Sequence, residues 1–251
     1  MLPTVNIPVY FANLPSTGEK VKYQPFLVKS DKMLAISAQS SDDAVILEAI
    51  KNIVRDCTFN KIDPDKVPSF DTEYLFVQAR AKSKGEKVDL SFTCKNLVDG
   101  KECGCVNKMA ISCNDIIVKS SDPTHTKKVM VTDSIGIEFK YPTIDKVVEI
   151  QKAVLSGKIE AIYGHIFDYV DSIFEGNAVF VPTEAENTTD PAEFTKAKFA
   201  QWIEALSPNQ FAKIEKFFAG IPELQSDVNL KCTKCGYTDA VHLSGLLSFL
   251  D

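Results

Sequence analysis

The sequence predicts an α+β protein in which helical segments combine with antiparallel β-hairpins, two of which share a four-cysteine site. Three observations favour this class. Residues 41–57 place apolar side chains at helical spacing behind an acidic cap. Residues 88–94 and 106–111 alternate between apolar and polar side chains, as strands do. A similar cysteine-bearing hairpin pattern recurs near the C-terminal end of the sequence.

The first segment, residues 1–86, is expected to hold two short strands followed by three helices. A turn at residues 15–18, Pro-Ser-Thr-Gly, would join the strands. Ser69 is expected to cap the third helix, after a proline-containing loop. The expected strands are residues 5–13 and 20–26, and the expected helices are residues 30–40, 41–57 and 69–83.

The second segment, residues 87–143, alternates and is expected to be β, whereas the third, residues 144–222, is expected to be mostly helical. Ser207 and Pro208 suit the start of the last helix, because serine caps and proline tolerates the first turn. The expected strands are residues 88–94, 106–111, 128–133 and 136–141; the expected helices are residues 145–155, 159–174, 192–205 and 209–219.

The fourth segment, residues 223–251, is expected to be a second cysteine hairpin followed by a short apolar helix at residues 244–250. Alternatively, all four segments form one compact unit with a helical insertion. The two cysteine hairpins follow the same pattern, although they lie far apart in the chain. In each, an alternating strand leads to a cysteine, and a second cysteine precedes glycine and another strand; these pairs are Cys94 with Cys103-Gly104, and Cys232 with Cys235-Gly236.

This pattern predicts a zinc-ribbon-like structural Zn²⁺ site formed by Cys94, Cys103, Cys232 and Cys235. Two thiolates at Cys-x-x-Cys spacing supply only two ligands, and a structural zinc needs four. The first hairpin can supply the other pair. Cys105 is an alternative to Cys103, but only Cys103 is followed by glycine as Cys235 is. A redox Cys-x-x-Cys would stand at a helix start, whereas this one stands between strands.

Composition argues against several classes of protein. The net charge is −6 and the sequence holds only two arginines, Arg55 and Arg80, so a general nucleic-acid binder is not expected. No apolar run is long enough to span a membrane, and the first residues lack the pattern of a secretory signal. We therefore expect a reducing compartment, in which seven cysteines do not form a disulfide framework.

No catalytic constellation is visible in the sequence. The three histidines, His125, His165 and His242, form no metal-binding pair of the His-x-x-x-His type, and no phosphate-binding glycine loop or nucleophile elbow occurs. Cys57 falls on an apolar helical stripe and is expected in the core. We therefore expect no enzyme activity.

Several short blocks of the first hundred or so residues resemble the baseplate hub proteins of T4-type phages, a group that includes a hub subunit and a hub assembly protein. The resemblance weakens after about residue 111. The blocks are Leu2-Pro3-Thr4, Leu14-Pro15-Ser16-Thr17-Gly18, the run from Tyr23 to Lys29, the run from Pro68 to Phe76, the run from Ala79 to Ser83, Gly85-Glu86, and the run from Leu90 to Cys94.

The resemblance implies a non-enzymatic role in forming the baseplate of a contractile tail, through contacts with other tail proteins. It also implies a location in the host cytoplasm during assembly or in the virion. It brings no catalytic residue. The alternative from the cysteine pattern alone is a zinc-ribbon regulator that binds nucleic acid, which the acidic charge disfavours.

Overall fold

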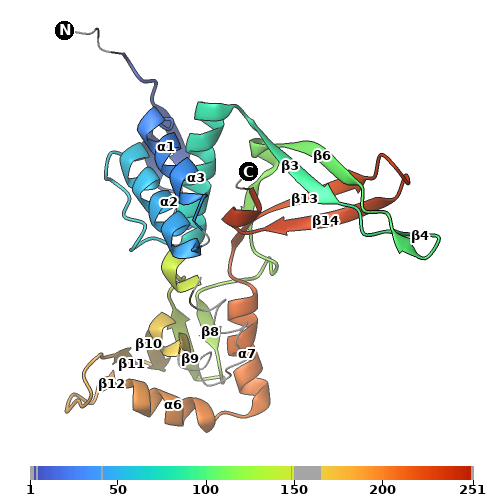
Figure 1. The fold of residues 1–251 in the computed structure, drawn as a ribbon. Coiled ribbons are helices and arrows are strands. Elements are labelled where there is room, and N and C mark those ends of the chain that lie inside the picture. Colours follow the sequence, from blue (N-terminus) through green and yellow to red (C-terminus); the bar gives the residue numbers. More distant parts are fainter. Residues whose placement is uncertain (1–2, 4, 41, 148, 150–164, 250–251) are drawn as a thin grey trace. The chain divides into compact units, whose positions relative to one another are not determined.

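The computed structural model describes residues 3, 5–40, 42–147, 149 and 165–249 (Figure 1). The chain divides into two compact units. Unit 1 is Met1–Lys119 together with Glu223–Asp251, and unit 2 is Ser120–Pro222. Each unit combines helices with antiparallel sheet, so the predicted α+β class is confirmed. Among the described helices, none has the length and apolar character needed to cross a bilayer.

Unit 1 begins with a hairpin and three helices, as the sequence predicts. β1 (Tyr10–Asn13) pairs antiparallel with β2 (Lys20–Tyr23). The helices are α1 (Val28–Ser37), α2 (Asp43–Cys57) and α3 (Ser69–Lys84). The Asp42 side chain caps α2 by accepting from the Ala44 N–H at 3.0 Å, which confirms the predicted cap. Two expected starts are wrong: α1 begins two residues before Ser30, and Ser69 is the first residue of α3 and not its cap.

Helix α3 lies at the centre of unit 1. It contacts α2, β7 (Ile117–Lys119), β13 (Glu223–Lys231) and the 3₁₀ turn η1 (Cys113–Asp115). Phe70 and Phe76 are fully buried, and polar residues of the same helix are buried with them. Asp71 accepts hydrogen bonds from the backbone N–H and the hydroxyl of Ser16. A helix packed on several sides has no single apolar stripe, so its central place is not evident from periodicity.

The strands of unit 1 form three small sheets besides the β1–β2 hairpin (Figure 1). β3 and β6 make a two-stranded ribbon, β4 and β5 make a short hairpin, and the third sheet has the order β14-β13-β7. A 3₁₀ turn, η3, follows β14, in place of the expected helix at residues 244–250, whose last residue lies outside the described range. The bounds are β3 Lys87–Thr93, β4 Leu97–Val98, β5 Lys101–Glu102, β6 Val106–Ser112, β7 Ile117–Lys119, β13 Glu223–Lys231, β14 Thr238–Ser244 and η3 Leu246–Phe249.

The third sheet joins the two parts of the chain that make up unit 1. β7 and β13 pair antiparallel, and Lys119 lies opposite Glu223 in the register. These two residues are the last before unit 2 and the first after it. Unit 2 is therefore an insertion into unit 1. The two residues that flank it in the chain are a cross-strand pair of the third sheet.

Unit 2 is built on a five-stranded sheet in the order β12-β11-β10-β9-β8. Its core contains Ile137 and Phe139 from the sheet and Ile214 and Phe217 from α7. The elements are β8 Lys128–Met130, β9 Ile135–Phe139, the 3₁₀ turn η2 Phe167–Tyr169, β10 Val170–Glu175, β11 Ala178–Pro182, β12 Glu193–Phe194, α6 Lys196–Glu204 and α7 Pro208–Ala219.

Two of the helices expected in the third segment are present as α6 and α7, but strands β10, β11 and β12 occupy other described positions of that segment. The helix predicted at residues 159–174 is replaced at its C-terminal end by β10, which forms a hairpin with β11 across Gly176, whose φ is 58°. Most of that helix's earlier part, and most of the one at residues 145–155, lie outside the described residues. The prediction at residues 209–219 is confirmed, since Ser207 and Gln210 form a capping box at the start of α7.

Candidate metal centre

The two cysteine hairpins have the same backbone hydrogen bonds. In the first, Gly104 N–H donates to Cys94 O at 3.0 Å, and Cys94 N–H donates to Cys105 O at 2.9 Å. In the second, Gly236 N–H donates to Cys232 O at 3.0 Å, and Cys232 N–H donates to Tyr237 O at 2.8 Å. The similarity seen in the sequence is therefore a repeated three-dimensional turn.

The glycine of each turn is required by its conformation. Gly104 has φ 63° and Gly236 has φ 73°, a region that side-chain-bearing residues rarely adopt. The left-handed residue after Cys103 or Cys235 lets the chain reverse while the preceding thiol stays directed inward. Each hairpin thus presents two thiols at the ends of one loop.

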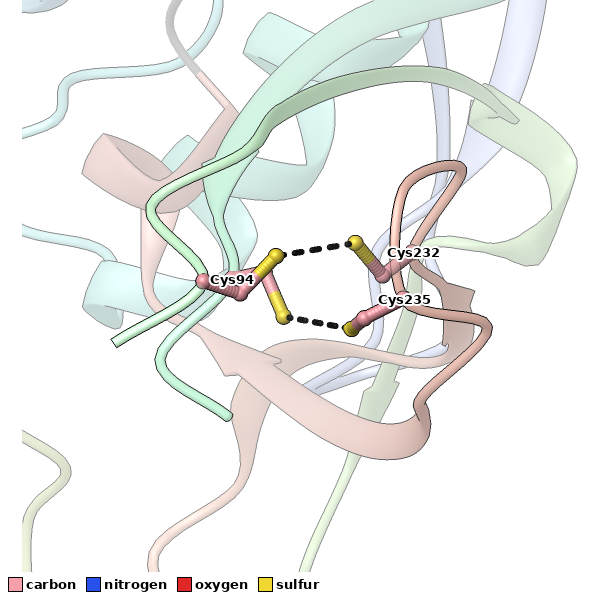
Figure 2. Close-up of side chains that lie close together, drawn as sticks. Cys94, Cys232 and Cys235 are labelled. Atoms are coloured by element: carbon pink, nitrogen blue, oxygen red, sulfur yellow. Dashed lines mark hydrogen bonds between the residues drawn. The ribbon is translucent and has the colours of Figure 1, made fainter. Parts of the chain in front are cut away.

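The structure brings the four predicted thiols together, all within 4.8 Å of one another (Figure 2). Cys94 Sγ lies 3.7 Å from Cys235 Sγ, and Cys103 Sγ lies 3.8 Å from Cys232 Sγ. A tetrahedral zinc with Zn–S bonds of about 2.3 Å places neighbouring sulfurs about 3.8 Å apart. The four cysteines therefore lie close enough to hold a metal ion, at spacings that suit a tetrahedral one.

Cys105 lies outside this group. In the backbone pattern it occupies the place of Tyr237, one residue after the left-handed glycine. Its thiol lies near the Thr233 hydroxyl, at 3.7 Å, and near Asn107 Oδ1, at 3.9 Å. The geometry thus favours Cys103 over Cys105 as the fourth thiol of the cluster.

Local hydrogen bonds affect the four thiols unequally. The backbone N–H of Cys235 donates toward the Cys232 sulfur and, with Lys234 N–H and the Asn107 amide, lowers the pKa of Cys232 to about 6 despite opposing desolvation. The backbone of Asn96 lowers the pKa of Cys94, but burial and the other three thiols outweigh it and raise this pKa to about 12. The Cys232 thiol therefore ionises readily, whereas ionisation of Cys94 beside it needs a cation in the cluster.

Two asparagines support the cluster from outside. Asn107 is only 3% exposed, and its amide nitrogen lies 3.7 Å from Cys232 Sγ and donates to Cys105 O at 3.0 Å. Asn96 places its amide nitrogen 3.8 Å from Cys235 Sγ. Donors of this kind stabilise metal-bound thiolates. Sequence reasoning missed both residues, because their contacts reach across the two hairpins.

The chemistry of the group is that of a closed site. Four sulfur ligands would complete a tetrahedron and leave no position for water or substrate. The remaining cysteines are elsewhere: Cys57 and Cys113 are buried in unit 1, and burial raises the pKa of the Cys57 thiol to about 12. Within the ranges that the structure describes, no other group of histidine, cysteine or acidic residues clusters in this way.

These features define a mixed helix–sheet protein with a four-thiol centre that joins two distant hairpins. The sequence matches the family described as T4 bacteriophage base plate protein over residues 7–251, and the chain belongs to that family. Comparison with curated proteins finds no match. Comparison with solved structures finds none either. The chain is therefore a phage baseplate protein, and the family match covers both units.

Proposed function

We propose that this baseplate protein acts in the hub of a contractile phage tail, as a non-enzymatic structural or assembly component that works through protein–protein contacts. The match to the baseplate family over residues 7–251 carries the proposal. Other tail proteins are its expected partners. It would be made in the host cytoplasm and act there or in the virion.

We further propose that Cys94, Cys103, Cys232 and Cys235 hold a structural Zn²⁺. Four thiolates suit zinc and also iron, so the donor set alone leaves two candidate metals. Zinc is proposed because a closed four-cysteine site with no redox partner is the usual setting of structural zinc. The ion would hold together hairpins from the two parts of unit 1, and its binding energy would add to folding stability.

Two measurements test the hub role. Quantitative mass spectrometry of purified particles and of infected cells measures where the protein resides. A few copies in each particle support a hub component, and abundance only in infected cells supports an assembly factor. Deletion of the gene is expected to abolish hub or baseplate complexes. Intact, infectious tails from the deletion mutant would contradict both forms of the proposal.

Metal analysis tests the zinc site separately. Purified full-length protein is expected to contain one zinc per chain by elemental analysis and native mass. Iron in place of zinc would support the four-cysteine metal site but show that zinc is the wrong metal. A native mass equal to that of the bare polypeptide, unchanged by a chelator, would show that the thiols are free.

A further inference from the structure

The segment that precedes β1 has the sequence pattern of a strand, but no strand lies beside it. The alternation of apolar side chains predicts a strand over residues 5–13, whereas the structure pairs only Tyr10–Asn13 with β2. Residues 5–9 are exposed and belong to no helix or strand. We call these five residues the arm. β2 does not continue beside the arm, because the chain turns away after Tyr23 and Gln24 N–H donates to Cys57 O at 2.9 Å.

The backbone of β1 has one open edge. Leu14 N–H donates to Glu19 O at 2.8 Å, in register with the β1–β2 pairing. Successive residues of a strand direct their N–H and C=O groups to opposite edges, so the even-numbered residues of β1 face β2. The odd-numbered residues Phe11 and Asn13 therefore direct these groups away from β2. No other strand pairs with β1 in the part of the chain that the structure describes.

The arm can continue this open edge. Val5, Ile7 and Val9 are odd-numbered, so in a strand that extends β1 their N–H and C=O groups lie on the same edge as those of Phe11. Each of the three keeps its N–H. Pro8 has no N–H, but it falls on the opposite edge. The open edge therefore offers an uninterrupted series of donors and acceptors to an added strand, which is the basis of binding by strand addition.

The side chains of these odd-numbered residues are apolar and exposed. Alternate side chains of an extended chain share one face, so these four form a single row. Their exposed fractions are 80% for Val5, 39% for Ile7, 40% for Val9 and 59% for Phe11. An open edge with an apolar face is the kind of surface that pairs with another chain. Its burial would be favourable, since the gain follows the apolar area removed from water.

Positive charge lies beside this apolar row. Lys22 is the cross-strand partner of Phe11 and shares its face, and Lys20 Nζ lies 4.7 Å from the centre of the Phe11 ring. Both lysines are exposed, and neither β1 nor β2 contains a carboxylate. A partner with apolar and acidic side chains is therefore complementary to this face. A second copy carries the same lysines beside the same edge, so charge does not favour the pairing of two such edges.

We propose that the arm and β1 together add as a strand to the open sheet edge of another baseplate protein, whose edge carries apolar side chains with carboxylates beside them. Backbone hydrogen bonds along the odd-numbered edge would supply affinity, and the apolar row would supply specificity. The inference rests on the proposed function, because that role supplies the partner. It adds to that role the surface by which this chain is joined to its neighbour.

Two proline substitutions test the two edges of the arm separately. Ile7→Pro removes a donor from the open edge, whereas Asn6→Pro removes one from the edge that Pro8 already interrupts. When each variant replaces the full-length protein in infected cells, Ile7→Pro is expected to lower the yield of assembled baseplates about tenfold. Asn6→Pro is expected to leave the yield unchanged. Equal yields from the two variants would overturn the proposal.

Controls on the purified variants separate binding from folding. Both proline variants are expected to unfold at the wild-type temperature, since the arm belongs to no helix or strand. Deletion of the gene separates the two proposals. Intact tails without the gene would contradict the baseplate role, whereas normal yields from Ile7→Pro, where the deletion abolishes baseplates, would contradict the arm contact alone.

Charge and cross-linking test the identity of the partner. The double variant Lys20→Glu/Lys22→Glu is expected to lower the yield of baseplates, whereas Lys108→Glu, an exposed charge change on β6, is not. A photo-reactive residue in place of Val5 is expected to cross-link to an edge strand of a different tail protein in complexes purified from infected cells. Cross-links that join only two copies of this chain would overturn the proposal.

Discussion

Asn107 accepts hydrogen bonds from both the backbone N–H and the hydroxyl of Thr233, at 2.8 and 2.9 Å, although 126 residues separate the two. The same side chain also donates to Cys105 O. Asn107 therefore ties the two cysteine hairpins together without any metal. Its burial makes each of these hydrogen bonds costly to lose.

Replacing Asn107 with alanine is expected to destabilise unit 1 by about 2–3 kcal/mol, because donors and acceptors of Thr233 and Cys105 lose their partner. Urea unfolding measures the change. Asn114→Ala, at an exposed position next to the ribbon, is the matched control and should change the free energy of unfolding little. Equal stability of the two variants would contradict this role of Asn107.

Removal of one thiol tests the cluster. Cys232→Ser is expected to lose bound metal and to lower the free energy of unfolding by about 3 kcal/mol or more, since an incomplete tetrahedron binds far more weakly. Native mass spectrometry and thermal unfolding measure the two effects. Cys105→Ser is the matched control and should keep the metal, because its thiol lies outside the cluster. Metal loss from the Cys105 variant would instead make Cys105 a ligand.

The carboxyl of Glu73 predicts a pH dependence. Burial in α3, helped by the nearby Glu223, raises the pKa of Glu73 to about 8. The folded state therefore holds a proton that the unfolded state releases near its ordinary pKa. This contribution to stability is fully present below the pKa that Glu73 has in the unfolded state, and it is lost as the pH rises through about 8. Over this range the free energy of unfolding falls by at most about 1.4 kcal/mol per pH unit.

Glu73→Gln is expected to remove this dependence, so that the variant gains stability relative to the wild type as the pH rises. Urea unfolding of both proteins across this pH range measures the difference. Any pH dependence that arises from the four-cysteine cluster is the same in both proteins and does not affect this difference. A difference that does not vary with pH would show that the Glu73 carboxyl titrates normally.

Excision of unit 2 tests its status as an insertion. Lys119 and Glu223 are cross-strand partners, so a short Asn-Gly turn can join β7 to β13 in place of residues 120–222. The shortened protein is expected to fold and to contain the same amount of metal as the full chain. Circular dichroism and native mass measure both properties. An unfolded product would show that unit 1 needs the inserted residues.

Gly136 in β9 leaves space for an aromatic ring. A Cβ built at this position would lie 2.1 Å from the Phe174 ring, and the Met130 sulfur is also close. Gly136→Ala is expected to destabilise unit 2 by about 2 kcal/mol through this overlap. Thermal unfolding compared with Ser172→Ala, on the neighbouring strand, measures the effect. An unchanged melting temperature would mean that Phe174 moves aside at little cost.

Local signals explain which features the sequence predicts and which it does not. The caps at Asp42 and Ser207 fix helix starts, and the repeated cysteine-glycine pattern is enough to group four distant thiols into one predicted site. The β10–β11 hairpin is not among the sequence-based expectations, although Gly176-Asn177 is a two-residue turn signal. The pairing of β7 with β13 and the contacts of Asn107 depend on the tertiary structure, and no local spacing encodes them.

The insertion of unit 2 also sets an order of events during synthesis. The ribosome makes Cys94 and Cys103 first, and it then adds all of residues 120–222 before the partners of these cysteines appear. Unit 2 can fold on the emerging chain before Cys232 and Cys235 are made. During that time the thiols of Cys94 and Cys103 lack the other two thiols of the cluster, and β7 lacks its neighbouring strand β13. Capture of the ion would then be a late step, and the nascent chain would stay open to chaperones and oxidants until residue 235 has left the exit tunnel.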